Sequence, residues 1–496
     1  MFPAQVRTPR RMLPATLFAL VLVMGACGTN TPSATPRFPS SASPSSAGGS
    51  PTPIPTVTLP GTIDDGPVRD HLQALERIAL EHDGLRTAGT AGFEDSVDYV
   101  ADQLRGFGYE VETPSFTVAT YRELPGSTIT VSGGGASFSG GDHFRAMIYS
   151  ASGRVTAPVV TVGFPDSAAG EGNRGCAAGD WEGFPADAIA LTPPGPCLRR
   201  DEAMLAQDAG AAALVVAYPD WRVGQARRPT LIAPDGIDIP VLAAIGEVGD
   251  ALTAAADATT VVTVDVTTEI GSATVRNVIA EAGGPGNRII MLGAHLDSVH
   301  DGPGINDNGS GAAAVLEIAR LFAASNEPGT FRFAFWAAEE EGLHGSGDYV
   351  QSLTPAEREE IAFYLNLDML GSPNGVPFVY RDSAAASGSS AISGFLAAWL
   401  QENGEGAEFE DVGGASDHYF FEQAGIPTGG IFSGATERKT SAQAAAYGGS
   451  AGEPMDACYH LACDTADNVD VDRVVLYARA AASAALLLAR GELLPF

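Results

Sequence analysis

Hydrophobic residues follow two patterns that alternate along the second half of the chain. Short apolar runs, typical of buried strands, occupy residues 275–280, 288–293, 330–336, 362–368, 377–380 and 426–432. Apolar positions at helical spacing occupy residues 310–324, 345–351, 389–403, 417–423 and 471–488. Alternation of this kind predicts an α/β fold, with a mostly parallel sheet sandwiched by helices.

The first half of the folded chain has a different organisation. Residues 65–82 and 93–107 have the apolar spacing of amphipathic helices, and residues 109–118 and 128–131 are strand-like. Glycine-rich breaks follow near residues 133 and 140. The next block has one short helix and several apolar strands, at 201–209 and at 158–162, 188–191, 212–216 and 239–244. We expect residues 134–264 to form a β-rich inserted domain, and residues 61–133 and 265–496 to form the main domain.

The first residues have the organisation of an export signal, which we place at 1–26. Arginines precede an apolar segment at 13–24, which is too short to cross a bilayer comfortably. The residues 24–27 (Met-Gly-Ala-Cys) resemble a bacterial lipobox, in which Cys27 carries the lipid. The alternative is an ordinary signal peptide with a chance cysteine, and export could be of the general or the twin-arginine type.

Residues 27–60 are rich in Ser, Pro, Thr and Gly, and they predict a disordered tether. A lipid at Cys27 and this tether predict a protein held on the outer face of the bacterial cell membrane. Disulfides persist there, so Cys176 and Cys197 are expected to pair, although spacing alone does not fix connectivity.

Composition narrows the possible partners. The chain has 496 residues, more than one ordinary domain, and 45% of them are hydrophobic, enough for a large core. The formal net charge is −32, and Lys439 is the only lysine. These values argue against nucleic acid or an anionic lipid surface as a partner of the folded part.

A histidine and two aspartates follow the apolar run at 289–292. His295 and Asp297 come just after this run, and Asp307 lies in the polar, glycine-containing segment 306–311 that leads into a helical pattern. In an open α/β sheet, ligands bind beyond the carboxyl ends of the strands. A His-x-Asp pair alone is weak support for a site, so its interpretation depends on what else reaches this edge.

Further candidate ligands follow other segments. Three glutamates at 339–341 follow one apolar strand, and Asp368 follows the next. Taken alone, the glutamates are typical of a solvated loop and the aspartate of a turn cap. His460 lies between Cys458 and Cys463, which could close a tight loop around it. A zinc knuckle is less favourable there, because no further thiol ligands lie nearby.

Together these residues suit a pair of metal ions. Imidazole suits zinc, and carboxylates can bridge two metals about 3.5–4 Å apart. Such a pair generates a hydroxide nucleophile at neutral pH and stabilises the oxyanion formed on an amide. A carboxylate free of metal must still move the proton, and Glu339 beside the candidate ligand Glu340 could do so.

Five motifs together resemble those of the secreted bacterial di-zinc aminopeptidases of the leucyl-aminopeptidase kind. They lie at 293–298, 306–311, 336–340, 366–369 and 458–460, in the order and at the spacing of that family. The block around Cys197 and residues 203–216 resembles the protease-associated domain. With the lipobox, this makes the chain similar to actinobacterial lipoprotein aminopeptidases that carry that domain.

The resemblance implies a zinc-exopeptidase fold and hydrolysis of the N-terminal bond of peptides with a free N-terminus, through a hydroxide bridging two zinc ions. It also implies residue roles: His295 and Asp368 for one zinc ion, Glu340 and His460 for the other, Asp307 as bridge, Glu339 as general base, Tyr459 as oxyanion donor, Asp297 as partner of the His295 imidazole, and Cys458–Cys463 as a disulfide.

The sequence leaves two alternatives to the aminopeptidase activity open. A carboxypeptidase or other amidohydrolase could use the same scaffold, because the metal core alone does not select which end of a peptide is cut. A catalytically silent peptide-binding lipoprotein is the other alternative, and the intact Glu339 argues against it. Residues 416–418 (Ser-Asp-His) match the family pattern and are given only a supporting role. His300, His344 and His418 have no partner that the sequence identifies and are expected to be surface or structural.

Overall fold

The computed structural model describes residues 57–133, 135–164, 174–256, 259–283, 288–323, 325, 327–381 and 388–493. The expected signal peptide (1–26), Cys27 and the tether up to residue 56 lie outside the described residues. All described residues belong to one compact unit of the chain, Ile54–Phe496. Within these ranges, no helix has the length and apolar character that crossing a membrane requires.

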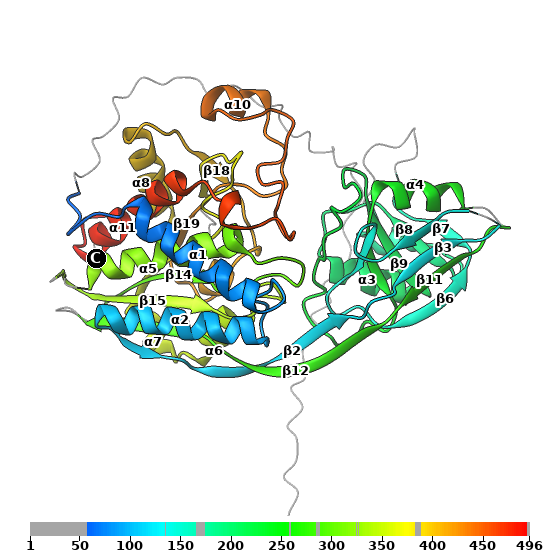
Figure 1. Cartoon of the computed structure of the whole chain (residues 1–496), viewed down its shortest axis with the longest axis horizontal. Helices are drawn as coiled ribbons and strands as arrows, with labels where there is room; N and C mark the ends of the chain where they lie inside the picture. The colour runs from blue at the N-terminus through cyan, green and yellow to red at the C-terminus, as the bar shows by residue number, and fades with distance from the viewer. Residues whose placement is uncertain are drawn as a thin grey trace, which may run out of the picture. The chain divides into compact units, whose positions relative to one another are not determined.

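The main domain is built on an eight-stranded sheet with the order β1-β13-β15-β14-β16-β19-β17-β18 (Figure 1). The central strands β15, β14, β16 and β19 pair in parallel, whereas β1, β13 and β17 add antiparallel pairs. The strands are Glu110–Glu112, Val278–Gly283, Thr330–Trp336, Ile289–His295, Ile361–Leu367, Thr428–Phe432, Phe378–Tyr380 and Glu408–Glu410, in sheet order. The mixed sheet with a parallel centre confirms the predicted fold class.

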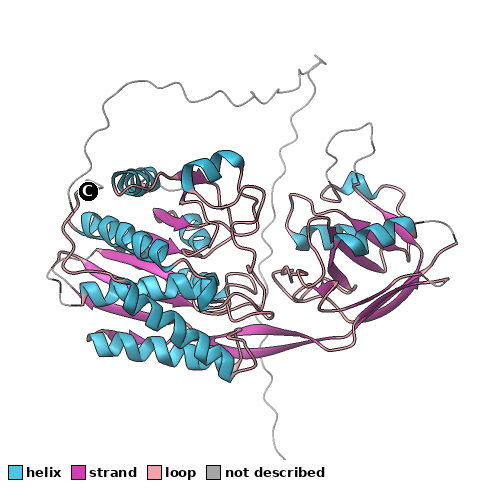
Figure 2. Ribbon diagram, turned by 45° about the horizontal axis from the view of Figure 1, so that its top comes forward, coloured by secondary structure: helices cyan, strands magenta, loops and turns pink. Residues whose placement is uncertain are grey.

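Helices cover both faces of this sheet (Figure 2). One face carries α1 (Asp65–Glu81), α2 (Ala91–Phe107), α5 (Gly311–Phe322), α8 (Ser389–Glu402) and α11 (Val471–Ala489). The other carries α6 (His344–Ser352), α7 (Pro355–Glu360) and α9 (His418–Gln423). A further helix, α10, spans Ser441–Tyr447. Because both faces are covered, β14 is buried at every position, which explains its unbroken apolar run.

The start of α5 brings the edge of the sheet and a loop close together. Gly311 begins this helix directly after Ser310, and a Cβ on Gly311 would lie 2.1 Å from the carbonyl oxygen of Leu367 at the end of β16. Only glycine fits at this approach. As a result, the segment that contains Asp307 is held against the carboxyl ends of the central strands.

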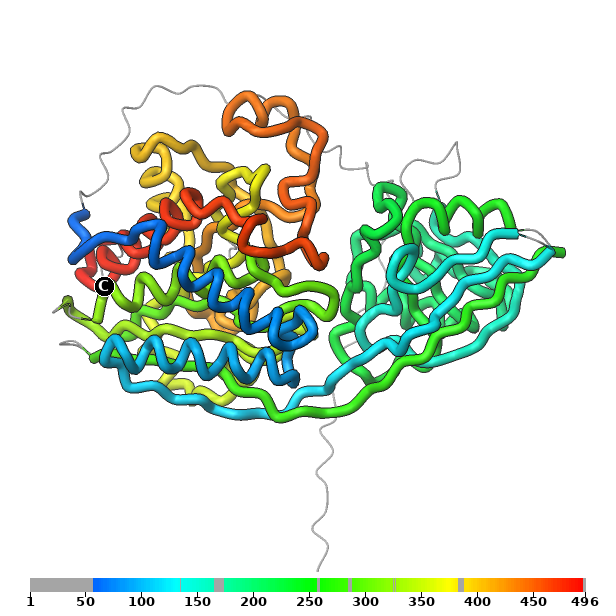
Figure 3. The backbone as a smooth tube through the Cα atoms, viewed as in Figure 1, coloured from blue at the N-terminus to red at the C-terminus, as the bar shows by residue number. Residues whose placement is uncertain are grey.

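The inserted domain is joined to the main domain by a two-stranded ribbon. β2 (Ser115–Glu123) and β12 (Thr268–Arg276) pair antiparallel along their whole length (Figure 3). Pro114 separates β1 from β2, so the strand expected at 109–118 is split in two. The strand expected at 275–280 is likewise divided between β12 and β13, on either side of Asn277.

Two sheets form the inserted domain. One has the order β5-β10-β9-β8-β7 and the other β4-β3-β11-β6. The strands, in chain order, are Thr128–Val131, Ser137–Ser139, Phe144–Ala146, Gly153–Ala157, Val159–Thr161, Ile189–Thr192, Ala213–Tyr218, Val241–Ile245 and Val262–Val266, with helices α3 (Arg199–Asp208) and α4 (Gly246–Ala254). β3, which we expected to precede the inserted domain, pairs with β11 inside it.

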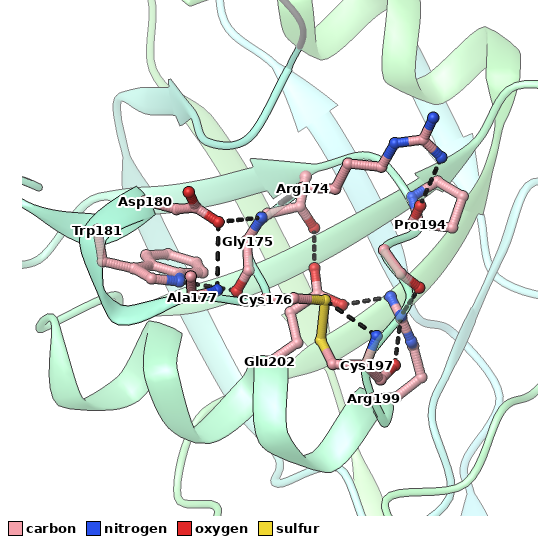
Figure 4. The surroundings of a disulfide bond; sticks show 12 residues. Arg174, Gly175, Cys176, Ala177, Asp180, Trp181, Pro194, Cys197, Arg199 and Glu202 are labelled. Atoms are coloured by element: carbon pink, nitrogen blue, oxygen red, sulfur yellow. Dashed lines mark hydrogen bonds and ion pairs between the residues drawn. A yellow bond between two sulfur atoms is a disulfide. The ribbon is translucent and has the colours of Figure 1, made fainter. Parts of the chain in front are cut away.

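A disulfide closes one loop of the inserted domain (Figure 4). Cys176 and Cys197 are bonded, as expected from the sequence. The carboxylate of Asp180 accepts the backbone N–H groups of Gly175 and Ala177 beside it. The buried Trp181 donates from its indole to the carbonyl of Gly175, so the loop is tied to the core as well as to itself.

Candidate metal centre

Adjacent strands deliver the candidate ligands to one edge of the main sheet. His295 is the last residue of β14, the glutamates 339–341 follow β15, and Asp368 follows β16. β14 pairs in parallel with both neighbours, so the three carboxyl ends lie side by side. Asp307 lies just before α5, and His460 lies in a loop before α11. Residues distant in sequence therefore meet at the edge that the strand pattern predicts.

Asp307 lies between the two histidines. Its Oδ1 is 3.1 Å from Nε2 of His295, and its Oδ2 is 3.0 Å from Nε2 of His460. Burial acts to raise the pKa of Asp307, but the two imidazoles lower it well below its usual value. A carboxylate that presents one oxygen to each side has the geometry of a ligand shared by two cations.

One further carboxylate accompanies each histidine. Oδ1 of Asp368 lies 3.5 Å from Nε2 of His295, and Oε2 of Glu340 lies 3.2 Å from Nε2 of His460. The ligand atoms of His295, Asp307 and Asp368 all lie within 4.8 Å of one another, and so do those of Asp307, Glu340 and His460.

The donor atoms fit two bound cations. Oε1 of Glu340 and Oδ1 of Asp368 are buried and accept no hydrogen bond. Buried carboxylate oxygens are costly to leave without a partner, and a cation would supply one. Neutral imidazole and carboxylate oxygens together suit zinc.

Glu339 lies next to this set, with a carboxylate oxygen within 4.8 Å of ligand atoms of His295 and Glu340. Its Oε2 is 4.0 Å from Nε2 of His295, farther than the carboxylates of Asp307 and Asp368. Burial raises the pKa of Glu339 well above its usual value, although His295 acts in the opposite direction. A raised pKa suits a group that takes up a proton and returns it near neutral pH.

The loop that contains His460 is closed by the Cys458–Cys463 disulfide. The ring of Tyr459 stacks on the His460 imidazole, with centroids 3.7 Å apart. The carbonyl oxygen of Leu461 lies against Gly302, where a Cβ would be only 2.3 Å away. The missing side chain of Gly302 therefore lets this loop approach the segment that follows His295.

Asp297 supports the glutamates through their backbone. Its Oδ1 accepts the N–H of Glu339 at 3.1 Å, and its Oδ2 accepts the N–H of Glu340 at 3.2 Å. We expected Asp297 to orient the His295 imidazole. Nδ1 of His295 lies 3.7 Å from the Asp297 carboxylate, but only 3.1 Å from the Asp297 backbone carbonyl. The carboxylate thus holds the general-base candidate and a ligand candidate in register.

Three supporting residues were not singled out from the sequence. The carboxylate of Asp464 accepts the backbone N–H groups of Asn306 and Asp307. Arg86 is fully buried, and its guanidinium donates to the carbonyls of Leu296, Pro303 and Gly304. Arg227 of the inserted domain donates to the carbonyl of Tyr459. The only sequence signal was the place of Asp464 beside Cys463.

The remaining polar candidates differ in their contacts, and Nε2 of His344 is buried without a hydrogen-bond partner among the described residues. Ser416 donates to Oδ2 of Asp368 at 2.6 Å, in keeping with a supporting role. Nε2 of His300 lies 3.2 Å from Oε1 of Glu341. His418 is buried at the start of α9, and burial lowers the pKa of both His344 and His418.

Comparisons with known proteins agree with this geometry. The model of peptidase family M28 matches residues 277–485, and the PA domain model matches residues 155–252. An aminopeptidase of Pseudomonas aeruginosa is 38% identical over 436 residues, which cover 86% of this chain and 81% of that protein. A probable lipoprotein aminopeptidase, LpqL, of Mycobacterium tuberculosis is 38% identical over 431 residues, covering 84% and 83%.

A solved structure extends the likeness to the fold. The aminopeptidase from Aneurinibacillus sp. strain AM-1 superposes with a TM-score of 0.68 at 27% identity, covering 86% of this chain and 93% of its own. The likeness to the two bacterial relatives spans both the main domain and the inserted domain. The chain therefore belongs to peptidase family M28, as a zinc aminopeptidase with a PA domain inserted in its catalytic domain.

Proposed function

We propose that the protein removes N-terminal residues from peptides with a free N-terminus, using two zinc ions held by His295 and Asp368, by Glu340 and His460, and by Asp307 between them. The carboxylate of Asp307, which presents one oxygen to each histidine at 3.0–3.1 Å, is the observation that carries this proposal. When bound, the ions would supply an acidified water and polarise the scissile carbonyl.

The protein side chains account for the proton transfers. Glu339 lies beside the ligands, with its Oε2 4.0 Å from Nε2 of His295, so it can take a proton from the attacking water and return it to the leaving amine. Burial, with Asp307 and Glu340 nearby, raises the pKa of Tyr459 well above its usual value. Its hydroxyl therefore keeps its proton and can donate to the oxyanion.

Hydrolysis of an aminoacyl-anilide and of its N-acetylated form tests this proposal. We expect turnover of the free amine and at least a hundredfold loss with the acetylated substrate. Equal turnover of both substrates would instead support an amidohydrolase that does not require a free N-terminal amino group. Release of residues from the carboxyl end of a peptide would support a carboxypeptidase.

A variant of the proposed base tests the mechanism separately. Glu339→Gln should lower kcat by about 10²–10⁴-fold, the range of general acid–base catalysis. Glu341→Gln is the matched control, because this buried neighbour faces His300 and not the ligand set. If Glu339→Gln kept near-wild-type turnover, Glu339 would not be the base. If the wild-type protein itself showed no turnover, the protein would instead be a catalytically silent binding protein.

We also propose that Cys27 anchors the enzyme to the outer face of the cell membrane through a lipid and the tether at 27–60. The lipobox-like residues 24–27 support this, and the relative LpqL is named as a probable lipoprotein. Cys27→Ser should move the protein from the membrane fraction into the medium. If the variant stayed with the membrane, an uncleaved signal segment would be the anchor.

A further inference from the structure

One loop of the inserted domain reaches the edges of the active site. It joins β9 to β10 and spans residues 219–240. Thr230 in this loop donates to the carbonyl of Glu341, and Arg228 pairs with Asp301 at 3.1 Å. Loops longer than about 12–15 residues without regular structure are uncommon in compact domains, and the ordered ones are usually functional. We name residues 219–240 the β9–β10 loop.

Arg227 in this loop contacts the catalytic loop itself. Its Nε donates to the carbonyl oxygen of Tyr459 at 2.8 Å, and the residue is only 7% exposed. Hydrogen bonds from a charged donor typically contribute about 1.5–3 kcal/mol. The contact is therefore strong enough to set the orientation of the peptide unit that it reaches.

That peptide unit controls two side chains at once. The Tyr459 carbonyl and the His460 amide share one plane, so fixing the carbonyl restricts both ψ of Tyr459 and φ of His460. His460 has φ +59°, a left-handed conformation that costs a non-glycine residue about 1–2 kcal/mol. Backbone in such a conformation persists when its surroundings over-determine it.

Other residues of the inserted domain fix the position of the Arg227 side chain. Its guanidinium lies over the ring of Trp221, 5.5 Å from the centroid. Trp221 in turn stacks on Tyr218, the last residue of β9, with centroids 3.8 Å apart and planes within 3°. Nη1 of Arg227 also donates to the carbonyl of Gln225. A rigid series of contacts thus runs from the sheet of the inserted domain to the peptide before His460.

We propose that Arg227 is a positioning residue of the active site, through which the inserted domain fixes Tyr459 and His460 for catalysis and zinc binding. The proposal rests on the proposed function, because it presupposes that Tyr459 and His460 act on the oxyanion and the metal. It assigns the inserted domain an indirect role in catalysis, which is to hold the loop that contains Tyr459 and His460.

Arg227→Ala, Arg227→Lys and two controls test the proposal in the full-length enzyme. Arg222→Ala is the matched control in the same loop, since the guanidinium of the exposed Arg222 donates to the nearby carbonyls of Pro219 and Trp221. Arg145→Gln controls for docking of the inserted domain, because it removes an ion pair with Asp301 but touches no catalytic residue. Folding is checked for each variant by thermal unfolding.

We expect Arg227→Ala to lower kcat about ten- to hundredfold with little change in KM, and to weaken binding of one of two zinc ions in competition with a chelator. Arg227→Lys, which keeps one charged donor, should recover part of both. If Arg227→Ala matched Arg222→Ala in kcat and zinc affinity, or if Arg145→Gln lowered kcat as much, the proposal would be overturned.

The zinc measurement separates this proposal from the proposed function. If wild-type protein failed to cleave aminoacyl-anilides, the proposed function would fail, yet the effect of Arg227→Ala on zinc affinity would still test the positioning role. If the wild type were active and Arg227→Ala were as active and bound zinc as tightly, only the positioning role would fail.

Discussion

Replacing Asp297 by asparagine removes one of the two acceptors that hold the glutamates beside the metal centre. Asp297 is completely buried, and each of its carboxylate oxygens accepts one backbone N–H, from Glu339 or from Glu340. Asparagine keeps one oxygen and places an amide NH₂ against the other N–H. One buried donor then loses a charged acceptor, which should destabilise the zinc-loaded protein by about 1.5–3 kcal/mol.

The metal centre should weaken in parallel. Loss of a partner that orients ligands typically costs about 10- to 100-fold in metal affinity or activity. That range corresponds to about 1.4–2.7 kcal/mol of zinc-dependent stability. Without zinc, removing the Asp297 charge also relieves repulsion from nearby buried carboxylates, so the destabilisation should be smaller in chelator than in zinc.

Urea unfolding of wild type and Asp297→Asn, each with zinc and with chelator, measures both effects. Asp70→Asn, at an exposed carboxylate on α1, serves as the control for an ordinary surface change. If Asp297→Asn unfolded at the same urea concentration as Asp70→Asn in zinc, with the same zinc affinity, the backbone N–H groups of Glu339 and Glu340 would not depend on Asp297.

Two further predictions concern buried charged residues outside the ligand set, Arg86 and Glu317. Arg86→Met should lower the free energy of unfolding in urea by at least about 3 kcal/mol, because three buried carbonyls lose a charged donor. Arg86→Lys should lower it by less. Equal stability of Arg86→Met and wild type would refute this prediction. Burial acts to raise the pKa of Glu317, but His71 and Arg320 lower it below its usual value of 4.5. The stability that this carboxylate contributes is therefore complete above pH 4.5 and is lost as the pH falls through the lowered pKa. Glu317→Gln should therefore flatten the acid limb of stability against pH in chelator, and an unchanged limb would show that other groups control it.

The sequence predicted the central fold because burial leaves a strong pattern. β14 and β15 are apolar at almost every position, and β15 has the bounds expected from its residues. The ribbon of β2 and β12 was not predicted. β12 is largely exposed along its length, so its residues carry no apolar face and no alternation that periodicity could detect.

The ligand candidates were within reach of sequence reasoning for a related reason. His295, Glu340 and Asp368 each stand where an apolar strand stops, and parallel strands bring their carboxyl ends to one edge. Asp307 and His460 follow no strand, so their choice as candidates rested on a loop-to-helix junction and on a loop between two cysteines, and their individual roles came from the family resemblance. The structure brings all five together at that edge.

The supporting layer largely escaped prediction because it acts on backbone rather than on side chains, and Asp297 alone was expected, as a partner of the His295 imidazole. Four charged residues hold the site in this way: Arg86 through carbonyls between His295 and Asp307, Asp297 through the amides of Glu339 and Glu340, Asp464 through the amides of Asn306 and Asp307, and Arg227 through the carbonyl of Tyr459. Every residue type offers the same carbonyl, and all but proline the same N–H, so the receiving positions carry no signature in sequence. It follows that a related inserted domain grafted onto this catalytic domain should support full activity only if it presents a charged donor at the position of Arg227, however well its own fold is preserved.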